Sequence, residues 1–270
     1  MVCRQTDGFF NQTTYHRMKT KLFFEGEENQ FSSFVDAQKN ASYIILADAN
    51  TNGFCVPVVL QLFPCLRSAQ RIVIPQGESN KSMQMTTFIC AELLKLQANN
   101  NTILVCVGGG MVCDIGGFAA SIYQRGIETI YIPTTLLGMI DACYGGKTGV
   151  NFEGVKNYLG SFHPPKAIFA QPIFLKTLDS RVLQSGIAEG IKHALLSNTT
   201  FWHSIQNVAA NYFYSLSFIK EALLLKKRYV DEDERDKGIR QSLNLGHSIG
   251  HAIESYSFQT ATPLLHGEAI

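Results

Sequence analysis

The sequence predicts an α/β domain over residues 1–170, followed by an all-α domain over residues 171–270. In the first half, short apolar runs typical of buried parallel strands alternate with segments of helical length. Such alternation is typical of a parallel sheet wound with helices. After about Pro165 only helical segments follow, and prolines cluster at this change of pattern. We expect ligands to bind in the cleft between the two domains.

The individual elements follow from local patterns. Short runs rich in apolar residues predict strands at 21–24, 43–46, 71–74, 103–107 and 129–132. Residues 82–97 are predicted to be helical because Met85, Ile89, Leu93 and Leu96 recur at helical spacing. Further helices are predicted at 181–196, 201–213, 217–236 and 240–256.

Composition excludes several classes of protein. The chain has 270 residues, of which 46% are hydrophobic and 17% charged, so a folded core is expected. A net charge of +1 argues against broad binding to nucleic acid or membrane surfaces. The cysteines are odd in number and none forms a CxxC pair, which indicates free thiols in a reducing compartment; they stand at 3, 55, 65, 90, 106, 113 and 143. Without a signal pattern or an 18-residue apolar run, we expect a cytoplasmic protein.

A glycine run follows the predicted strand 103–107. Gly108, Gly109 and Gly110 stand between that strand and an apolar segment of helical character, the context of a Rossmann-like dinucleotide loop. The spacing departs from GxGxxG, so we interpret it as a variant loop, although a tight turn would also use glycines. Asp48 could bind a ribose or cap the next element. Asp114 could bind the cofactor or serve as a first-turn helix acid.

Histidines near the end of the chain predict a metal site. His247 and His251 are four residues apart and therefore share one helix face. Together with Glu189 and His266 they suggest a zinc site with an open coordination position. The alternative is a set of surface or satisfied core histidines. Glu189 and His193 are also four apart and could mimic a metal pair.

Lysines stand in or beside glycine-rich strings in the central block. Lys147 lies in GGKTGVN, and Lys156 precedes Asn157. Such lysines often contact phosphate or carboxylate oxygens. The alternative is a pair of solvated lysines in turns.

Taken together, these strings resemble one enzyme family. VGGGMVCDIGGFAA, RGI, IPTTLL, GGKTGVN, KN, AEGIKH, GIRQSLNLGHSIGHAIE and LHGEA occur in the order of the 3-dehydroquinate synthase family, within the sugar phosphate cyclases. The resemblance extends from about Asp48 to the last residue. It implies a dehydroquinate synthase-like fold with an NAD-binding domain and a metal-binding domain. It also implies an NAD- and zinc-dependent lyase of the shikimate pathway, which leads to chorismate and the aromatic amino acids. Cobalt is the alternative metal. The implied reaction converts 3-deoxy-D-arabino-heptulosonate 7-phosphate to 3-dehydroquinate and phosphate, with NAD recycled in each turnover.

The resemblance also implies roles for individual residues. The metal ligands fall on Glu189, His247 and His266, so His251 becomes a substrate-side residue rather than a ligand and His193 a neighbour. The implied NAD contacts are Asp48, Glu78, Lys81, Gly109, Gly110, Asp114, Thr134, Thr135 and Asp141, the last near the nicotinamide. The implied contacts to the phosphorylated sugar-acid substrate are Lys147, Lys156, Asn157, Lys192, Lys226, Arg240, Asn244 and His251. Arg125 matches an arginine that reaches the partner subunit's phosphate site, which implies a homodimer.

The chain departs from the family pattern in two places. Family members continue past the HGEA segment with more helices and a substrate-contacting lysine, so we expect a C-terminally truncated helical domain with exposed apolar faces and a looser zinc site. Cys143 and Tyr144 replace small residues near the nicotinamide pocket.

Three rival functions remain. The first is another sugar phosphate cyclase, a 2-deoxy-scyllo-inosose or valiolone-type synthase, against which Arg240, Asn244 and the spacing of Lys226 favour the dehydroquinate branch. The second is a metal-dependent polyol dehydrogenase. The third is a non-catalytic NAD-binding remnant.

Overall fold

A six-stranded, all-parallel sheet forms the centre of the first half of the molecule. The computed structural model describes residues 20–197, 199–257 and 259–270. The strand order is β1-β8-β5-β4-β2-β3. The strands are β1 (Lys21–Phe24), β2 (Ser42–Asp48), β3 (Gln70–Ile74), β4 (Thr102–Gly108), β5 (Glu128–Pro133) and β8 (Ala167–Ala170).

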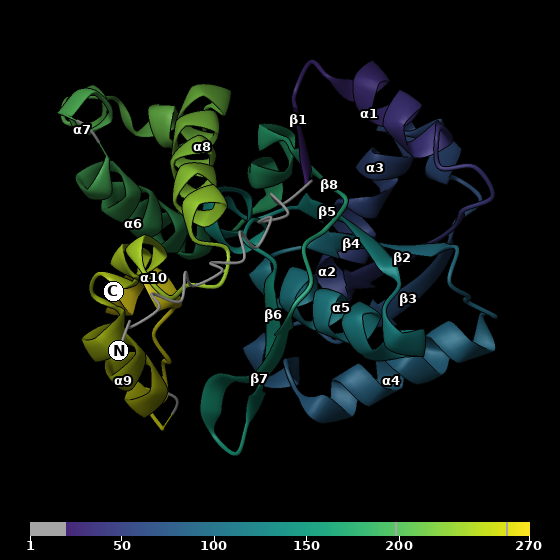
Figure 1. Ribbon diagram of the computed structural model, residues 1–270. Coiled ribbons are helices and arrows are strands. Elements are labelled where there is room, and N and C mark those ends of the chain that lie inside the picture. The colour runs from purple at the N-terminus through teal and green to yellow at the C-terminus, as the bar shows by residue number, and fades with distance from the viewer. Residues whose placement is uncertain (1–19, 198, 258) are drawn as a thin grey trace, which may run out of the picture.

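Helices cover both faces of this sheet (Figure 1). Helices α1 and α3 lie on one side, and α4 and α5 on the other. On the first side, the rings of Phe31, Phe63 and Phe169 pack with centroids 4.6–5.1 Å apart and are fully buried. The elements are α1 (Glu28–Asp36), α2 (Ala49–Phe54), α3 (Val56–Leu62), α4 (Met83–Lys95) and α5 (Gly110–Ile122), with short 3₁₀ turns η1 (Pro64–Leu66), η2 (Glu78–Asn80) and η3 (Tyr123–Arg125).

The chain reverses its direction across the sheet between β2 and β4. From β2 it continues outward to β3, returns to β4 on the other side of β2, and then continues to β5. In parallel α/β sheets, the crevice at the carboxyl ends of the strands beside such a reversal is where ligands bind. The topology therefore directs attention to the loops that follow β2, β4 and β5.

A two-stranded antiparallel hairpin stands apart from the sheet and packs on α5 (Figure 1). It consists of β6 (Lys147–Phe152) and β7 (Val155–Phe162). A Cβ atom at Gly117 of α5 would lie 2.5 Å from Thr148 Cγ2, so glycine permits this close packing. One turn of π-helix, η4 (Gly138–Ala142), precedes the hairpin. Isolated π-turns of this kind are frequent at functional sites.

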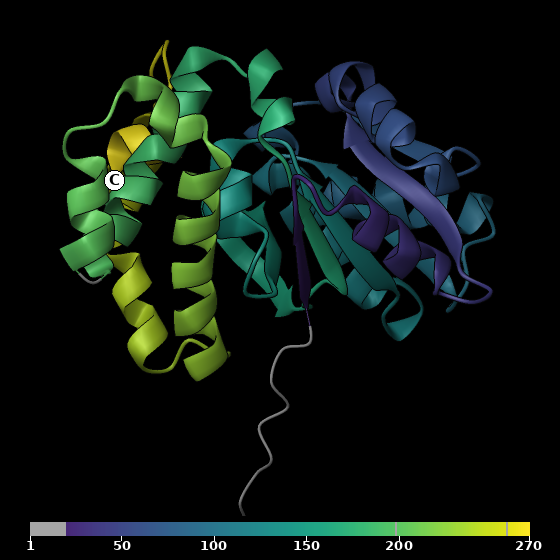
Figure 2. The same cartoon turned by 90° about the horizontal axis from the view of Figure 1, so that it is seen from above.

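The last third of the chain folds as a group of helices beside the sheet (Figures 1 and 2). Phe218 is fully buried at its centre, and its ring lies 5.2–6.0 Å from the rings of Phe201, Tyr212 and Phe213. The elements are η5 (Pro172–Thr177), α6 (Ser180–Leu196), α7 (Thr199–Ile205), η6 (Ala210–Tyr214), α8 (Leu216–Glu232), η7 (Ile239–Asn244), α9 (His247–Ser257) and α10 (His266–Ala269). Among the described helices, none combines the length and apolar content that a membrane crossing needs.

The five predicted strands and the helix predicted at 82–97 are confirmed within a few residues. The helix predicted at 201–213 is wrong as one element, because Ala209 has an extended backbone between α7 and η6. The helix predicted at 217–236 ends at Glu232, where the Asp233 side chain accepts the N–H groups of Lys237 and Gly238.

The helix predicted at 240–256 is also wrong as one element. Gly246, with φ of +82°, separates η7 from α9. Six cysteines are free thiols, as expected, at 55, 65, 90, 106, 113 and 143; Cys3 lies outside the described residues.

Candidate active site

The predicted NAD residues of the sheet domain meet at the carboxyl edge of the sheet. Asp48 ends β2, Gly109 follows β4 and Thr134 follows β5, and these three strands are neighbours. Gly109 is the N-cap of α5 and supplies no side-chain acceptor, so the first-turn N–H groups can bind an anion. A Cβ at Gly109 would lie 2.8 Å from Thr135 Cγ2, so only glycine fits this close approach. The strand–glycine–helix arrangement predicted from the sequence is therefore present.

The structure decides between the alternatives for the two aspartates only in part. Asp48 Oδ1 accepts the N–H of Thr51 at 2.9 Å, while Thr51 Oγ1 accepts the N–H of Asp48 at 3.0 Å, so Asp48 does cap α2. Its predicted contact to a ribose stays a prediction. Asp114 lies beyond the first turn of α5, so the interpretation as a first-turn acid is wrong. Instead, Asp114 Oδ2 accepts a hydrogen bond from Lys81 Nζ at 2.6 Å.

The hairpin is joined to this nucleotide side by polar contacts. Lys81 Nζ also donates to Asn157 Oδ1 at 2.5 Å. Asn151 Nδ2 donates to Glu78 Oε1 at 3.1 Å, and the Asn151 backbone N–H donates to the Lys81 carbonyl oxygen at 2.8 Å. The predicted NAD residues Glu78 and Lys81 therefore contact the same hairpin that carries the predicted substrate residues.

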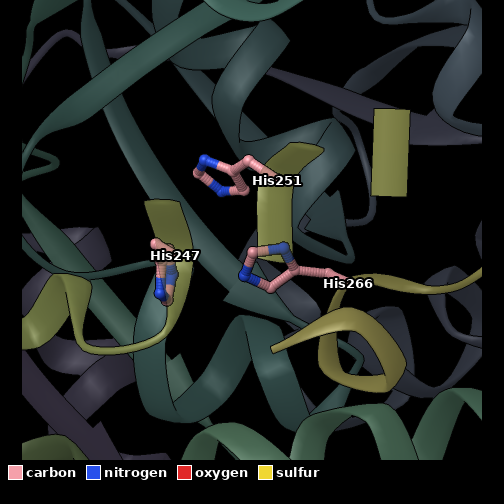
Figure 3. A group of neighbouring side chains, drawn as sticks. All are labelled: His247, His251 and His266. Carbon is pink, nitrogen blue, oxygen red and sulfur yellow. The ribbon is translucent and has the colours of Figure 1, made fainter. Parts of the chain in front are cut away.

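Three histidines gather on the helical side (Figure 3). His247 and His251 come from α9 and His266 begins α10, and their rings surround a common space with centroids 5.0–5.4 Å apart. A candidate ligand nitrogen from each lies within 4.8 Å of the others. Glu189 on α6 is fully buried, and its Oε1 lies 3.3 Å from His266 Nε2 and 3.7 Å from His247 Nε2.

This donor set fits a divalent metal ion. Neither carboxylate oxygen of Glu189 accepts a well-directed hydrogen bond from the described residues, although Lys192 forms an ion pair with Oε2. Burial opposes ionisation of Glu189, but His266 and Lys192 outweigh it and hold its pKa below the ordinary value. One carboxylate and two imidazoles are typical ligands of a catalytic zinc. A buried carboxylate that faces two imidazoles, as Glu189 does, is what such a site requires.

The histidines differ in protonation. Burial and the neighbouring Lys192 lower the pKa of His247, which favours the neutral ring that a metal needs. Burial also lowers the pKa of His251, as does the nearby His266. Burial opposes the charge on His266, but its close contacts with the carboxylates of Glu189 and Glu254 prevail and raise its pKa to about 9. Of these three rings, His266 is therefore the one whose surroundings favour the protonated form.

Every lysine of the predicted site is paired with a carboxylate of the chain. The pairs are Lys81–Asp114, Lys147–Asp236, Lys156–Glu254, Lys192–Glu189 and Lys226–Asp141. Cations can thus gather in one region of a chain whose net charge is only +1. An incoming phosphate or carboxylate must share or displace these internal partners.

Asp141 connects the π-turn to the helical domain. Its Oδ1 accepts hydrogen bonds from Lys226 Nζ at 2.7 Å and from His193 Nε2 at 3.2 Å. Burial would raise the pKa of Asp141, but Lys226 and His193 outweigh it and hold that pKa well below the ordinary range. His193, predicted to be only a neighbour, is fully buried and supports Asp141.

Three other predicted residues lie at the periphery of the site or away from it. Arg240 is 3% exposed and donates to the Gly145 carbonyl oxygen, just before Lys147. Asn244 is exposed at the end of η7. Arg125 is exposed beyond the far end of α5 and therefore lies at the opposite edge of the sheet from the nucleotide loop.

Sequence reasoning missed two acidic residues of the site. Glu254 pairs with Lys156 and His266, and Asp236 pairs with Lys147. Glu254 stands seven residues after His247, on the same helix face, and this spacing could have identified it. No spacing signal marks Asp236, because its partner lies in a distant hairpin.

Two family models match consecutive parts of the chain. The model described as 3-dehydroquinate synthase N-terminal matches residues 71–185, and the model described as 3-dehydroquinate synthase C-terminal matches residues 186–270. The chain is 42% identical over 246 residues to the 3-dehydroquinate synthase of Parabacteroides distasonis, covering 90% of this chain and 69% of that protein. The chain belongs to the 3-dehydroquinate synthase family.

Other members and relatives agree with this placement. The 3-dehydroquinate synthase of Blochmanniella floridana is 40% identical over 245 residues, which cover 86% of this chain and 65% of that protein. The chain thus spans about two thirds of the length of these family members.

Solved structures of related cyclases share the fold. A 2-deoxy-scyllo-inosose synthase complexed with carbaglucose-6-phosphate, NAD⁺ and Co²⁺ superposes with a TM-score of 0.81 and 28% identity, covering 92% of this chain and 70% of that one. A 2-epi-5-epi-valiolone synthase from Streptomyces hygroscopicus with NAD⁺ and Zn²⁺ superposes with a TM-score of 0.77 and 27% identity, covering 100% of this chain and 73% of that one. An iron-containing alcohol dehydrogenase from Corynebacterium glutamicum shares the fold alone. It superposes with a TM-score of 0.63 and 14% identity, covering 94% of this chain and 70% of that one.

Proposed function

We propose that this chain is an NAD- and metal-dependent 3-dehydroquinate synthase. It would convert 3-deoxy-D-arabino-heptulosonate 7-phosphate to 3-dehydroquinate and phosphate by phosphate elimination and ring closure. The observation that carries the proposal is that a candidate metal site lies beside a group of lysines suited to bind phosphate and carboxylate. A buried Glu189 faces His247 and His266, and paired lysines from the hairpin and helices lie around them. Family membership supports the same reaction.

The carboxyl edge of the sheet would hold the dinucleotide. NAD and a metal ion accompany the related cyclases named above, with Co²⁺ in one and Zn²⁺ in the other. We assign NAD to the loop after β4, with zinc as the metal and cobalt as the alternative. The proposed NAD residues are Asp48, Glu78, Lys81, Gly109, Gly110, Asp114, Thr134, Thr135 and Asp141. The proposed metal ligands are Glu189, His247 and His266.

The remaining polar side chains would bind and orient the substrate. When bound, NAD⁺ supplies a hydride acceptor that later returns the hydride, and the metal supplies a Lewis acid for the oxygen of the oxidised carbon. A ketone at that carbon acidifies the neighbouring C–H bond, which allows phosphate to leave. The proposed substrate contacts are Lys147, Lys156, Asn157, Lys192, Lys226, Arg240, Asn244 and His251. Lysines and arginine would hold the phosphate and carboxylate in place, and a neutral His251 could accept a proton and then return it.

The position of Arg125 supports a homodimer. This exposed arginine lies at the far edge of the sheet from the nucleotide loop of its own chain. A second copy would bring such an arginine to the phosphate site of its partner. Arg125→Ala should then weaken substrate binding in the dimer, whereas a monomer fully active at high dilution would contradict the proposal.

The rival reactions differ in what they release. Another sugar phosphate cyclase would use a sugar phosphate that lacks the carboxylate, and the two cyclase structures favour it as the second candidate. A polyol dehydrogenase would build up NADH in step with its product.

The decisive experiment measures phosphate release from the heptulosonate phosphate with NAD⁺, while absorbance reports NADH. We expect phosphate release without lasting NADH, loss of release after chelation, and recovery with Zn²⁺ or Co²⁺. Lys147→Met should lower turnover, because it removes a charge-assisted contact of about 1.5–3 kcal/mol. Lys95→Met is the control, since Lys95 is exposed on α4 and paired with Glu92. One NADH per product, or faster turnover of a carboxylate-free sugar phosphate, would assign the chain to a rival reaction.

A further inference from the structure

Glu254, on the last full turn of α9, is a buried carboxylate that joins two parts of the site. The residue is 2% exposed. Its Oε1 accepts a hydrogen bond from Lys156 Nζ of β7 at 2.5 Å, and its Oε2 lies 3.2 Å from His266 Nδ1. Burying a carboxylate is costly unless both oxygens find donors. Here one donor comes from the hairpin and the other from a predicted metal ligand.

The contact to His266 fixes which ring nitrogen is available to a metal. A carboxylate only accepts hydrogen bonds, so His266 must carry a proton on Nδ1 to bond with Glu254. The lone pair of a neutral ring then resides on Nε2, the atom that lies 3.3 Å from Glu189 Oε1. Metal-bound histidines usually donate their other N–H to a carboxylate or carbonyl, which fixes the tautomer and the ring orientation.

The contact to Lys156 extends the effect to the substrate side. Lys156 is held between Glu254 and Glu78, whose Oε1 lies 3.8 Å from Nζ. Its side chain is 15% exposed, so its position depends on these partners. One carboxylate therefore sets the orientation of a predicted metal ligand and the location of a predicted substrate cation.

We propose that Glu254 is a positioning residue that directs His266 Nε2 to the metal and holds Lys156 beside the metal site. The inference rests on the metal site of the proposed function but not on the identity of the substrate. Glu254 would not be a ligand itself, because both of its oxygens are directed to Lys156 and His266.

The test measures zinc affinity by competition with a chelating dye, with neither NAD nor substrate present. Glu254→Gln keeps the size of the side chain but loses the charge. We expect its zinc dissociation constant to rise 10–100-fold, the usual cost of losing such a partner. The zinc dissociation constant of Glu254→Asp should lie between those of the wild type and Glu254→Gln. Lys156→Met should stay within threefold of the wild type, because it removes the substrate-side partner alone. Glu221→Gln, an exposed acid on α8, controls for the loss of one negative charge.

Two results would overturn the proposal. One is a folded Glu254→Gln protein that binds zinc within threefold of the wild type; the other is an equal loss of affinity in Lys156→Met. If Glu254→Gln does not fold, nitrogen NMR of the zinc-loaded wild type decides, since coordination of His266 through Nδ1 would contradict the assignment. Failure of the wild type to bind zinc would also overturn it. A protein that binds zinc with this Glu254 dependence but releases no phosphate would refute the proposed reaction alone.

Discussion

The guanidinium group of Arg240 donates two hydrogen bonds, each 3.1 Å long, to the carbonyl oxygen of Gly145. The two residues are 95 positions apart in the chain. Gly145 has φ of +117° and ends the turn between the π-helix and Lys147. Arg240 therefore ties the helical domain to the start of the hairpin that carries the predicted substrate lysines.

Replacing Arg240 by lysine should destabilise the protein even though the charge is kept. A lysine ammonium cannot reproduce the planar fork, and Arg240 also donates to the Glu234 carbonyl oxygen at 2.7 Å. We expect a loss of about 1.5–3 kcal/mol in the free energy of unfolding, measured by urea denaturation. Arg228→Lys, an exposed change on α8, is the control and should stay within about 0.5 kcal/mol. If both variants are equally stable, Arg240 serves substrate binding only.

Lys226 and Asp141 should behave as a coupled pair. Removing the cation in Lys226→Met leaves Asp141 charged, with its side chain only 21% exposed. Breaking a buried pair costs about 3–5 kcal/mol, and the partial exposure of Asp141 favours the lower end, about 3 kcal/mol. The double variant Lys226→Met, Asp141→Asn should recover most of this loss in a double-mutant cycle. Additive losses of unfolding free energy would show that the two side chains are independent.

Alkaline stability should depend on Tyr43. Burial, with smaller contributions from Cys65 and Asp36, raises its pKa from 10.0 to about 12. Its hydroxyl donates to the Val35 carbonyl oxygen at 2.7 Å. Because the folded pKa is raised, this contribution is complete below pH 10 and is lost as the pH rises through about 12.

The test compares Tyr43→Phe with the wild type. At pH ~8 the variant should be less stable by about 1 kcal/mol, the net value of one hydrogen bond. This gap should narrow at pH ~11, because the wild type has lost part of the tyrosine contribution while the variant has none to lose. A difference that stays constant between the two pH values would contradict the assignment of the pKa.

Much of the sheet domain was predictable because its central strands β4, β5 and β8 are buried on both faces. The short apolar run Ile103–Val107 predicts such a strand, and the glycines after it mark the nucleotide loop. The hairpin was not predicted, since the glycine-rich string GGKTGVN was interpreted only as a place where a lysine could bind an anion or stand in a turn. In the structure Gly149 of this string stands opposite Gly160, where the two backbones approach closely.

The site was predictable where spacing reports a shared face. His247 and His251 do lie on one side of α9. Spacing reveals the pair Lys192–Glu189 on α6, but it could not reveal the partners of Lys147 and Lys156, because Asp236 and Glu254 meet these lysines only through tertiary packing. The same limit applies to Asp141, whose partners His193 and Lys226 lie on two other helices.

Metal content should separate His247 from His251, although both belong to the three-histidine group. The argument rests on Glu189, whose Oε1 lies 3.7 Å from His247 Nε2 and 3.3 Å from His266 Nε2. A metal bound by these three groups leaves coordination positions for substrate oxygens, with His251 beside them. We therefore expect His247→Ala to lose zinc after dialysis, measured by atomic absorption. His251→Ala should retain most of it and lose turnover instead.

The two histidines offer a matched comparison, since both lie on α9 and contact each other with ring centroids 5.0 Å apart. General damage to the helix should therefore affect both variants alike, and the unfolding midpoint of the metal-free proteins checks this. Glu189→Gln should reproduce the loss seen in His247→Ala, because a neutral amide is a poor zinc ligand. If His251→Ala loses as much zinc as His247→Ala, or if Glu189→Gln keeps it, the metal is bound by the three histidines and the carboxylate serves only to neutralise Lys192 and His266.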